Sequence, residues 1–342
     1  MTLKRRAFMA GGGGALMATL SPWPVARAAA LAQEARFFRI AAGPVDSSYF
    51  AVGTLIGNIV SSPPGARECE RGGSCGVPGL IAVTQTTAGA TANIEMIAKQ
   101  QLESGLCQAD IAYWAFHGTG MFRRQGAVPN LRAIANLYPE TMHVVVRSDS
   151  NIDEFRRLRG KRVSLGEENS STLVTARAML QTLGIAERDI KAQFLSPLEA
   201  AEALHQGKLD AFFLMSGVPA QTVRDLAGTG EIALIPIDGA EARKLRGAFP
   251  FFTETVIPEE TYQGIGATLS LSVGVLWAVG AEVDEKIVYG LTRALFHPNN
   301  RRALDTGHPY GRLIRPESAL DGVALPVHSG AALYYFEAGV IR

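Results

Sequence analysis

The sequence has few cysteines, almost no net charge and a low share of charged residues. Its 342 residues include 33 Lys or Arg and 32 Asp or Glu, which gives a formal net charge of +1. This balance lacks the basic excess that non-specific binding to phosphate backbones requires, so we expect no nucleic acid partner. A content of 47% hydrophobic and 19% charged residues excludes an intrinsically disordered chain and a charge-rich coiled coil. The length fits two domains or one large one.

The N-terminal apolar run is too short to cross a membrane. It extends from Ala7 to Leu20, whereas a spanning helix needs about twenty residues. Lys4, Arg5 and Arg6 precede the run, and Ala26-Arg27-Ala28 provides a small-x-small cleavage pattern. We predict a signal peptide over residues 1–28 that resembles a twin-arginine export signal, with the general secretory route as the alternative. Removing it leaves 29 basic and 32 acidic residues, so the mature chain is mildly acidic.

The three cysteines fit an exported protein. Cys69 and Cys75 bracket Glu-Arg-Gly-Gly-Ser in a Gly- and Pro-rich segment, and an oxidising compartment favours a disulfide between them. A structural zinc site needs four N or S ligands, and no His or further Cys lies close in sequence, so we predict no metal. Cys107 lies in an apolar run, which predicts a small buried hydrophobic residue.

Short apolar runs alternate with amphipathic stretches, which predicts βα units around a largely parallel sheet. The expected strands are 37–42, 80–86, 131–137, 143–147, 162–165, 191–195, 211–215, 232–236 and 271–279. The expected helices are 49–60, 90–103, 152–158, 171–183, 197–206, 219–227, 284–295 and 330–338. We predict an α/β fold with two lobes, lobe 1 comprising 36–142 and 281–342 and lobe 2 comprising 143–280. Residues 142–146 are the expected crossing between them.

The sequence offers no catalytic set. Residues 72–76 match the G-x-S-x-G pattern around Ser74, but a Pro- and Gly-rich segment surrounds them instead of the strand and helix of a nucleophile elbow. Gly160-Lys161 lacks the rest of a phosphate-binding loop, and no His-Glu-x-x-His motif is present. We therefore predict a protein that is not an enzyme and needs no cofactor. A reactive Ser74 or carboxylate would support the alternative of an exported enzyme.

Hydroxyl side chains follow two of the expected strands where helices begin. Asn169-Ser170-Ser171-Thr172 opens one helix, and Asp46-Ser47-Ser48-Tyr49 opens another. Free backbone N–H groups and the positive end of the helix dipole make such positions suitable for anions. Each segment alone also fits a plain N-cap. Because the two lie in different lobes, we expect them to face each other across a ligand cleft.

Several longer stretches carry a resemblance to a known family. They are Leu131 to Glu140, His143 to Arg147, Leu158 to Gly166, Ile235 to Gly239, and Val327 to Ala331 with Tyr334-Tyr335. From about Arg36 to Gly339 the chain resembles the TRAP-associated extracytoplasmic immunogenic (TAXI) proteins, the solute receptors of TRAP transporters. The resemblance implies a type II periplasmic binding protein fold that closes around a small acidic solute. It also implies a TRAP permease as partner.

The resemblance also implies a set of ligand-binding residues. In the first loop Ser48 and Tyr49 match the family in kind, and in a later segment Gln108, Asp110 and Tyr113 match. Ser170 and Thr172 are retained at the start of the lobe 2 helix, while Thr87 and Asn93 match a further motif. The set that we predict to bind ligand is Ser47, Ser48, Tyr49, Thr87, Gln108, Tyr113, Ser170, Ser171, Thr172 and Gly217.

Some departures from the family pattern bear on the ligand. Asp46 replaces a glycine, and Ala90 and Ala109 lack the expected hydroxyls. Together with Glu167 and Glu168, Asp46 places acids near the expected donors, and an amine-bearing ligand would relieve that repulsion. A glutamate- or glutamine-like amino acid therefore ranks ahead of a dicarboxylate such as 2-oxoglutarate. We predict a periplasmic receptor that delivers its solute to the permease, and a sensor subunit for a membrane kinase is the alternative.

Overall fold

The structure is a computed structural model that describes residues 35–45, 47–168 and 170–341, all within one compact unit. The expected signal peptide, Asp46 and Asn169 lie outside the described residues. Among the residues that are described, no helix is both long enough and apolar enough to cross a bilayer.

A mixed sheet forms the centre of the molecule, and its strands follow the order β4-β1-β5-β12-β6-β9-β7-β8. Strand β10 pairs with β6, and β11 pairs with β12. The strands are β1 (Arg36–Ala41), β4 (Leu80–Gln85), β5 (Ser104–Gln108), β6 (Leu131–Arg147), β7 (Arg162–Ser164), β8 (Lys191–Gln193), β9 (Ala211–Ser216), β10 (Ile232–Leu234), β11 (Phe252–Ile257) and β12 (Thr268–Gly280). The two-residue strands β2 (Ser61–Ser62) and β3 (Val77–Pro78) form a separate pair.

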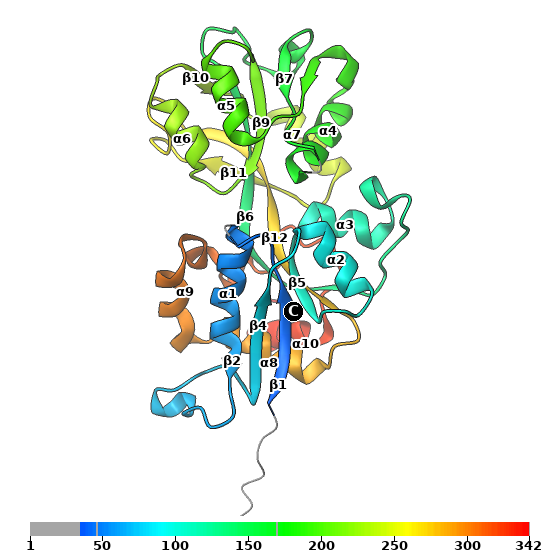
Figure 1. The fold of residues 1–342 in the computed structure, drawn as a ribbon, viewed down its shortest axis with the longest axis vertical. Coiled ribbons are helices and arrows are strands. Elements are labelled where there is room, and N and C mark those ends of the chain that lie inside the picture. Colours follow the sequence, from blue (N-terminus) through cyan, green and yellow to red (C-terminus); the bar gives the residue numbers. More distant parts are fainter. Residues whose placement is uncertain (1–34, 46, 169, 342) are drawn as a thin grey trace, which may run out of the picture. The chain divides into compact units, whose positions relative to one another are not determined.

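Helices pack around the strands of each lobe (Figure 1). Around the β4-β1-β5 end, which we call lobe 1, lie α1 (Ser48–Val60), α2 (Ala90–Ala98), α3 (Ala109–His117), α8 (Glu285–Leu295), α9 (Arg301–Gly307) and α10 (Ser329–Glu337). Around the β9-β7-β8 end, lobe 2, lie α4 (Ser171–Leu183), α5 (Pro197–His205), α6 (Gln221–Ala227) and α7 (Gly239–Ala248).

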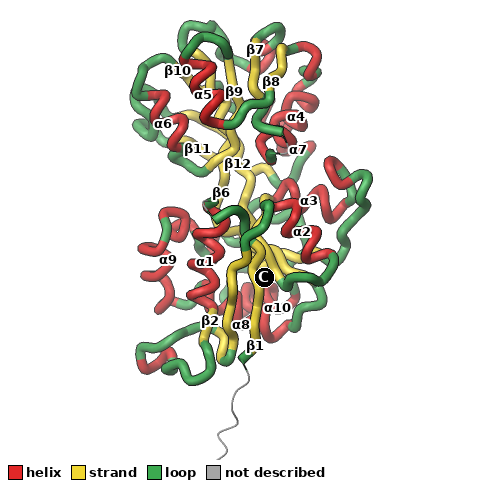
Figure 2. The backbone as a smooth tube through the Cα atoms, viewed as in Figure 1, coloured by secondary structure: helices red, strands yellow, loops and turns green. Residues whose placement is uncertain are grey.

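Strands β6 and β12 belong to both lobes and connect them (Figure 2). Residues 131–141 of β6 pair antiparallel with 272–280 of β12, and β6 then pairs with β9 from Thr141 onward. Strand β12 pairs with β11 over 268–273 and with β5 over 275–279, so it changes partner at Gly274. The lobe limits that we expect at 142/143 and 280/281 stay a prediction.

The sequence-based expectation of a largely parallel sheet is only partly right. Strands β1, β4 and β5 are parallel to one another, as are β7, β8 and β9, but β6, β10, β11 and β12 form antiparallel pairs. The chain leaves lobe 1 on β6 and returns on β12, and two neighbouring crossings in opposite directions must be antiparallel. The two strands expected at 131–137 and 143–147 are one continuous strand through Pro139, whose partner is Gly274.

Local sequence explains where the two helices at the lobe junction begin. Ser47 is the N-cap of α1, and its hydroxyl accepts a hydrogen bond from the backbone N–H of Phe50. Ser170 caps α4 in the same way through Leu173, and Gly184 ends that helix in the left-handed conformation at φ 81°. These caps satisfy one orphan N–H each and leave the other first-turn N–H groups without an intrahelical acceptor.

Aromatic side chains join the lobes on the side of α3. The ring of Trp114 lies 6.3 Å from that of Phe249 and 5.5 Å from that of Phe251, both of which follow α7 in lobe 2. Tyr113 contacts Phe251 at 5.6 Å. These edge-to-face contacts bury Trp114 and Phe251, so the two lobes share part of their hydrophobic core.

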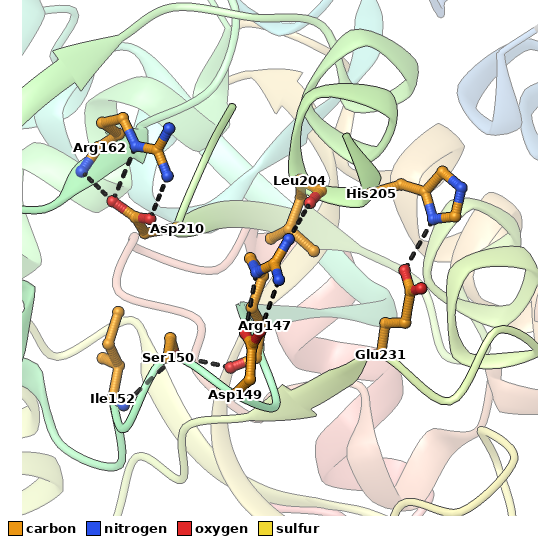
Figure 3. Close-up of polar contacts among 9 residues, drawn as sticks. All are labelled: Arg147, Asp149, Ser150, Ile152, Arg162, Leu204, His205, Asp210 and Glu231. Carbon is orange, nitrogen blue, oxygen red and sulfur yellow. Dashed lines mark hydrogen bonds and ion pairs between the residues drawn. The ribbon is translucent and has the colours of Figure 1, made fainter. Parts of the chain in front are cut away.

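Ion pairs fix the outer ends of the lobe 2 strands (Figure 3). The guanidinium of Arg162 donates to Asp210 through Nη2 at 2.5 Å and Nε at 3.1 Å, and the backbone N–H of Arg162 donates to the same carboxylate at 2.8 Å. This half-buried pair joins β7 to the turn before β9. The Arg147–Asp149 pair joins neighbours in sequence, and the Asp149 side chain is 67% exposed.

We expect Asp210→Ala to lower the free energy of unfolding by about 2 kcal/mol, because three donors lose a charged acceptor. The hydrogen bonds from Arg162 hold the pKa of Asp210 below its ordinary value, so this stabilisation is present at neutral pH. It should be lost as the pH falls through the folded-state pKa. Urea denaturation measures the difference. Asp149→Ala is the matched control and should change stability by under about 0.5 kcal/mol; equal losses in both variants would contradict the assignment.

A buried histidine lies on β6 where that strand enters lobe 2. His143 Nδ1 lies 2.9 Å from the carbonyl oxygen of Thr141, and Nε2 lies 2.7 Å from the hydroxyl of Tyr262. That hydroxyl also accepts a hydrogen bond from the backbone N–H of Ala220 at 2.8 Å. A neutral ring with its proton on Nδ1 satisfies every partner. Burial lowers the pKa of His143 to about 4, because a charged ring would lose its hydration there.

The free energy of unfolding should therefore fall as the pH drops from about 6.5 to 4. In this window the unfolded state takes up a proton on His143 that the folded state does not, which amounts to about 3 kcal/mol at the acid end. His143→Gln should remove this part of the pH dependence in chemical denaturation at a series of pH values. An unchanged slope in His143→Gln would refute the prediction.

Candidate functional site

A cleft of about 930 Å³ lies where the lobes meet. Its walls come from the starts of α1, α2 and α3 in lobe 1, from the start of α4 in lobe 2, and from β6 and β9. The residues that line it are Gly43, Pro44, Ser47, Ser48, Tyr49, Ala88, Gly89, Ala90, Thr91, Ala92, Glu95, Gln108, Ile111, Met121, Glu140, Glu168, Ser170, Ser171, Leu173, Val174, Arg177, Phe194 and Met215. A cavity of this size accommodates a small organic molecule.

Helix N-termini from both lobes open into this cleft. Ser47, Ser48 and Tyr49 belong to the start of α1, while Ser170 and Ser171 belong to the start of α4. Gly89 precedes α2 with φ 110°, a conformation that glycine adopts without strain. The positive ends of these helices and their hydroxyls create a region that favours negatively charged ligand groups.

Six of the ten residues predicted to bind ligand line the cleft. They are Ser47, Ser48, Tyr49, Gln108, Ser170 and Ser171. Their position in one cavity agrees with the expectation that the two hydroxyl-rich segments face each other. That each of them contacts a ligand stays a prediction.

The other four predicted residues lie outside the cleft lining and have contacts within the protein. The hydroxyl of Thr87 donates to Asn93 at 2.5 Å, and that of Thr172 accepts from the backbone N–H of Met215 at 3.2 Å. Tyr113 packs against His117 and Phe251. At Gly217 an added Cβ would lie 2.0 Å from the Tyr310 hydroxyl, so the close approach of Tyr310 excludes any side chain. That these four residues contact a ligand also stays a prediction.

The structure reveals a carboxyl group that residue-level reasoning did not single out. Glu140, near the middle of β6, lines the cleft, and Gln108 donates a hydrogen bond from Nε2 to its Oε2. Burial raises the pKa of Glu140 to about 7, and the neighbouring Asp110 carboxyl contributes. Glu140 ends one of the stretches that resemble the TAXI family, but a lone Glu after Pro139 gave no chemical signal in the sequence.

Arg177 on α4 is the basic residue among the described residues that line the cleft. Its guanidinium donates to both carboxylate oxygens of Glu187, at 2.7 and 3.1 Å, and lies 5.2 Å from the ring centre of Phe194. Glu187 lies beyond the end of α4, so helical spacing in the sequence did not reveal that Arg177 pairs with it. Arg177 therefore contributes a charge that is already neutralised.

A buried hydrogen bond joins the lobes behind the cleft. The hydroxyl of Thr175 on α4 donates to Asp110 on α3 at 2.6 Å, and the backbone N–H of Ile111 donates to the same carboxyl group at 2.7 Å. Both side chains are fully buried, and burial raises the pKa of Asp110 to about 6. Asp110 was carried over from the family motif, and here it connects the lobes outside the cleft lining.

Cys69 and Cys75 form the predicted disulfide, and Cys107 is buried and unpaired as expected. The structure adds a neighbour that sequence separation concealed. His297 Nε2 lies 3.9 Å from Cys69 Sγ, and the side-chain amide of Asn299 lies within hydrogen-bond distance of both sulfurs. These contacts attach the 69–75 loop to the turn after α8.

Comparison with known protein families identifies the family of the chain. The family model of the NMT1-like family matches residues 40–339. The chain belongs to the NMT1-like family. Membership of the TAXI family stays a prediction.

Solved structures share the fold of this NMT1-like protein. The periplasmic sulfonate-binding protein SsuA from Methylobacillus flagellatus KT has 14% sequence identity and a TM-score of 0.51; the match covers 90% of this chain and 96% of that one. XAC2383 from Xanthomonas citri bound to ATP has 12% identity and a TM-score of 0.50, with 89% and 96% covered. The structure of the same protein bound to chloride ion has 13% sequence identity and a TM-score of 0.50; the match covers 89% of this chain and 97% of that one. At this level of identity, the matches show a common mixed α/β fold.

Thr175→Val should lower the free energy of unfolding by about 2 kcal/mol, because the buried Asp110 carboxyl loses a donor that water cannot replace. Guanidinium denaturation measures the change. Thr292→Val is the matched control: this buried hydroxyl donates only to the carbonyl of Val288 within its own helix, and we expect a change below about 0.5 kcal/mol. A loss in Thr175→Val no larger than in the control would contradict a role for this bond in holding the lobes.

Proposed function

We propose that this NMT1-like protein is a periplasmic solute receptor that captures a small acidic solute and delivers it to a TRAP transporter permease. The solute is a glutamate- or glutamine-like amino acid or a dicarboxylate such as 2-oxoglutarate. Its carboxylate is held by Ser170, Ser171 and the start of α4, and the other end contacts Ser48, Tyr49 and Gln108. The protein carries out no chemistry of its own.

The observation that supports this proposal most directly is the cleft. Two helices of thirteen residues, one from each lobe, begin at the same cavity with serine side chains at their first positions. A ligand that contacts both helix starts stabilises the closed arrangement of the lobes, because only that arrangement presents both sets of donors at once. The shared fold with solved periplasmic binding proteins supports the same function.

The location follows from the N-terminal sequence. Residues 1–28 resemble a twin-arginine signal, which carries a folded protein across the inner membrane. The disulfide between Cys69 and Cys75 supports export to an oxidising compartment.

A sensor subunit read by a membrane kinase is the second candidate, because the same closure of the lobes serves either partner. The neighbouring genes separate the two functions. A pair of multi-span permease genes supports transport, and a kinase gene supports sensing.

Thermal denaturation of the mature protein, residues 29–342, with amino acids and C4 to C6 dicarboxylates tests ligand binding. A true ligand at about a hundred times its dissociation constant should add about 2.7 kcal/mol to the free energy of unfolding. Ser171→Ala removes a hydroxyl from the cleft and should weaken binding by about fivefold. Ser150→Ala, in lobe 2 outside the cleft, should bind as the wild type does. No stabilisation by any compound, with no change in solution scattering, would overturn the proposal.

A further inference from the structure

The Cys69–Cys75 disulfide forms a site of its own, apart from the cleft. It lies in the loop between β2 and β3 of lobe 1 (Figure 1), and neither cysteine lines the cleft. Both cysteines are partly exposed. Exchange with thiols favours exposed disulfides, because a thiolate must approach the sulfur atom that it attacks. A thiol in solution can therefore reach this bond while the protein is folded.

Hydrogen bonds hold this loop independently of the disulfide. The backbone N–H of Gly73 donates to the carbonyl oxygen of Glu68 at 2.9 Å, and that of Ser74 donates to the carbonyl oxygen of Arg67 at 3.1 Å. The hydroxyl of Ser74 also donates to the carbonyl oxygen of Ser61 on β2. The cross-link therefore constrains a short loop that backbone bonds already close. We expect the loop to keep its conformation when the disulfide is reduced.

Two side chains from the turn after α8 direct N–H groups at the sulfur atoms. The side-chain amide of Asn299 donates from Nδ2 to Cys69 Sγ at 3.6 Å and to Cys75 Sγ at 3.7 Å. His297 Nε2 lies 3.9 Å from Cys69 Sγ. The backbone N–H of Asn299 donates to Nδ1 of His297 at 3.2 Å, so Nδ1 is an acceptor. The proton of the neutral ring is then on Nε2, the atom that faces Cys69.

This proton distinguishes a donor site from a metal site. The ligand atoms of Cys69, Cys75 and His297 all lie within 4.8 Å of one another, which is close enough to hold a metal ion. A metal ion binds an imidazole nitrogen that has no proton, and a histidine ligand usually donates from its other nitrogen. His297 has the reverse arrangement, because its other nitrogen accepts a hydrogen bond. The cluster is therefore arranged to donate hydrogen bonds to sulfur.

The donors make the two sulfur atoms unequal. Cys69 Sγ is contacted by His297 and Asn299, whereas Cys75 Sγ is contacted by Asn299 alone. Hydrogen bonds from N–H groups stabilise the negative charge of a thiolate. In thiol–disulfide exchange an attacking thiolate displaces one of the two sulfurs, and the sulfur that carries the new charge more easily leaves faster. Attack at Cys75 with departure of Cys69 is the favoured direction.

We propose that the Cys69–Cys75 disulfide is redox-active and exchanges with dithiols, as a second functional site that does not depend on the solute. One thiolate of the dithiol forms a bond to Cys75 Sγ and breaks the bond to Cys69, which leaves as a thiolate beside His297 and Asn299. The second thiolate of the dithiol then attacks its own partner sulfur, and Cys75 leaves. The protein gains two electrons and two protons, and the dithiol loses them as it becomes a disulfide.

Trapping of the mixed disulfide identifies the sulfur that is attacked. The mature protein is exposed briefly to glutathione without denaturant, free thiols are alkylated, and peptide mass spectrometry locates each group. We expect glutathione on Cys75 and the alkyl group on Cys69. Cys107 is buried and should stay unmodified, which shows that the protein remained folded. Glutathione mainly on Cys69, or no reaction until denaturant is added, would overturn the proposal.

The rate of reduction by dithiothreitol measures what the donors contribute. His297→Ala should slow reduction by about tenfold, because the departing Cys69 thiolate loses a hydrogen bond. Asn299→Ala removes the amide donor and keeps the backbone N–H, and should slow reduction by about fivefold. His308→Ala is the matched control. Nδ1 of His308 also accepts a backbone N–H, from Tyr310 at 3.1 Å, but in a different turn, so this variant should react at the wild-type rate.

The outcomes separate a redox-active disulfide from a purely structural one. Slower reduction in His297→Ala and Asn299→Ala, with the control unchanged, supports the proposal. Equal rates in the wild type and all three variants overturn it, and so does faster reduction in the two variants, because the side chains would then protect the bond. If His297→Ala fails to fold, Asn299→Ala decides. Failure of any solute to bind in the cleft leaves these results unaffected.

Discussion

The pairing of β6 with β12 is the constraint on which the arrangement of the lobes depends. Both strands are buried along most of their length, and their hydrogen bonds continue from the β5 side of the sheet to the β9 side. Because the chain enters and leaves lobe 2 on this pair, neither lobe has a sheet of its own. Pro139 and Gly274 are paired with each other at the junction, where Pro139 lacks a backbone N–H and Gly274 lacks a side chain. This position also brings Glu140 to the cleft.

Much of the fold was predictable because local signals and tertiary packing agree. The helix expected over 171–183 has those bounds in the structure, since Ser170 and Gly184 mark its ends in sequence. The edges of α1, α5 and α8 were within two residues of expectation for the same reason. Strands β5 and β11 were missed, as were helices α3, α7 and α9. Part of α3 packs against the opposite lobe, as Trp114 does against Phe249, and such long-range packing leaves no local signal in the sequence.

The part of the candidate site that consists of helix N-termini was predictable from the sequence. Serines at the starts of helices can be recognised in the sequence because they are preferred N-cap residues. Six of the ten predicted residues line the cleft. The cleft's charges were not predictable, because burial and long-range pairing determine them. Glu140 depends on Gln108, 32 residues away, and Asp110 depends on Thr175, 65 residues away. The side chains of Thr87 and Thr172 lie outside the cleft lining and form hydrogen bonds within the protein, since a hydroxyl at a loop satisfies internal groups as readily as it binds a solute; their contact with ligand stays a prediction.

The close contact at Gly217 gives the molecule a mechanical linkage. Gly217 follows β9 in lobe 2 and lies against the hydroxyl of Tyr310, whose ring stacks on Tyr138 with centres 4.5 Å apart. The Tyr138 hydroxyl in turn lies 3.3 Å from that of Ser48 at the cleft. Each member of this series touches the next without a gap, so a rotation of lobe 2 that displaces Gly217 pushes on Tyr310 and moves the wall of the cleft. A contact between the lobes at Gly217 is thus connected, through the two stacked tyrosine rings, to the hydroxyl of Ser48 in the wall of the cleft.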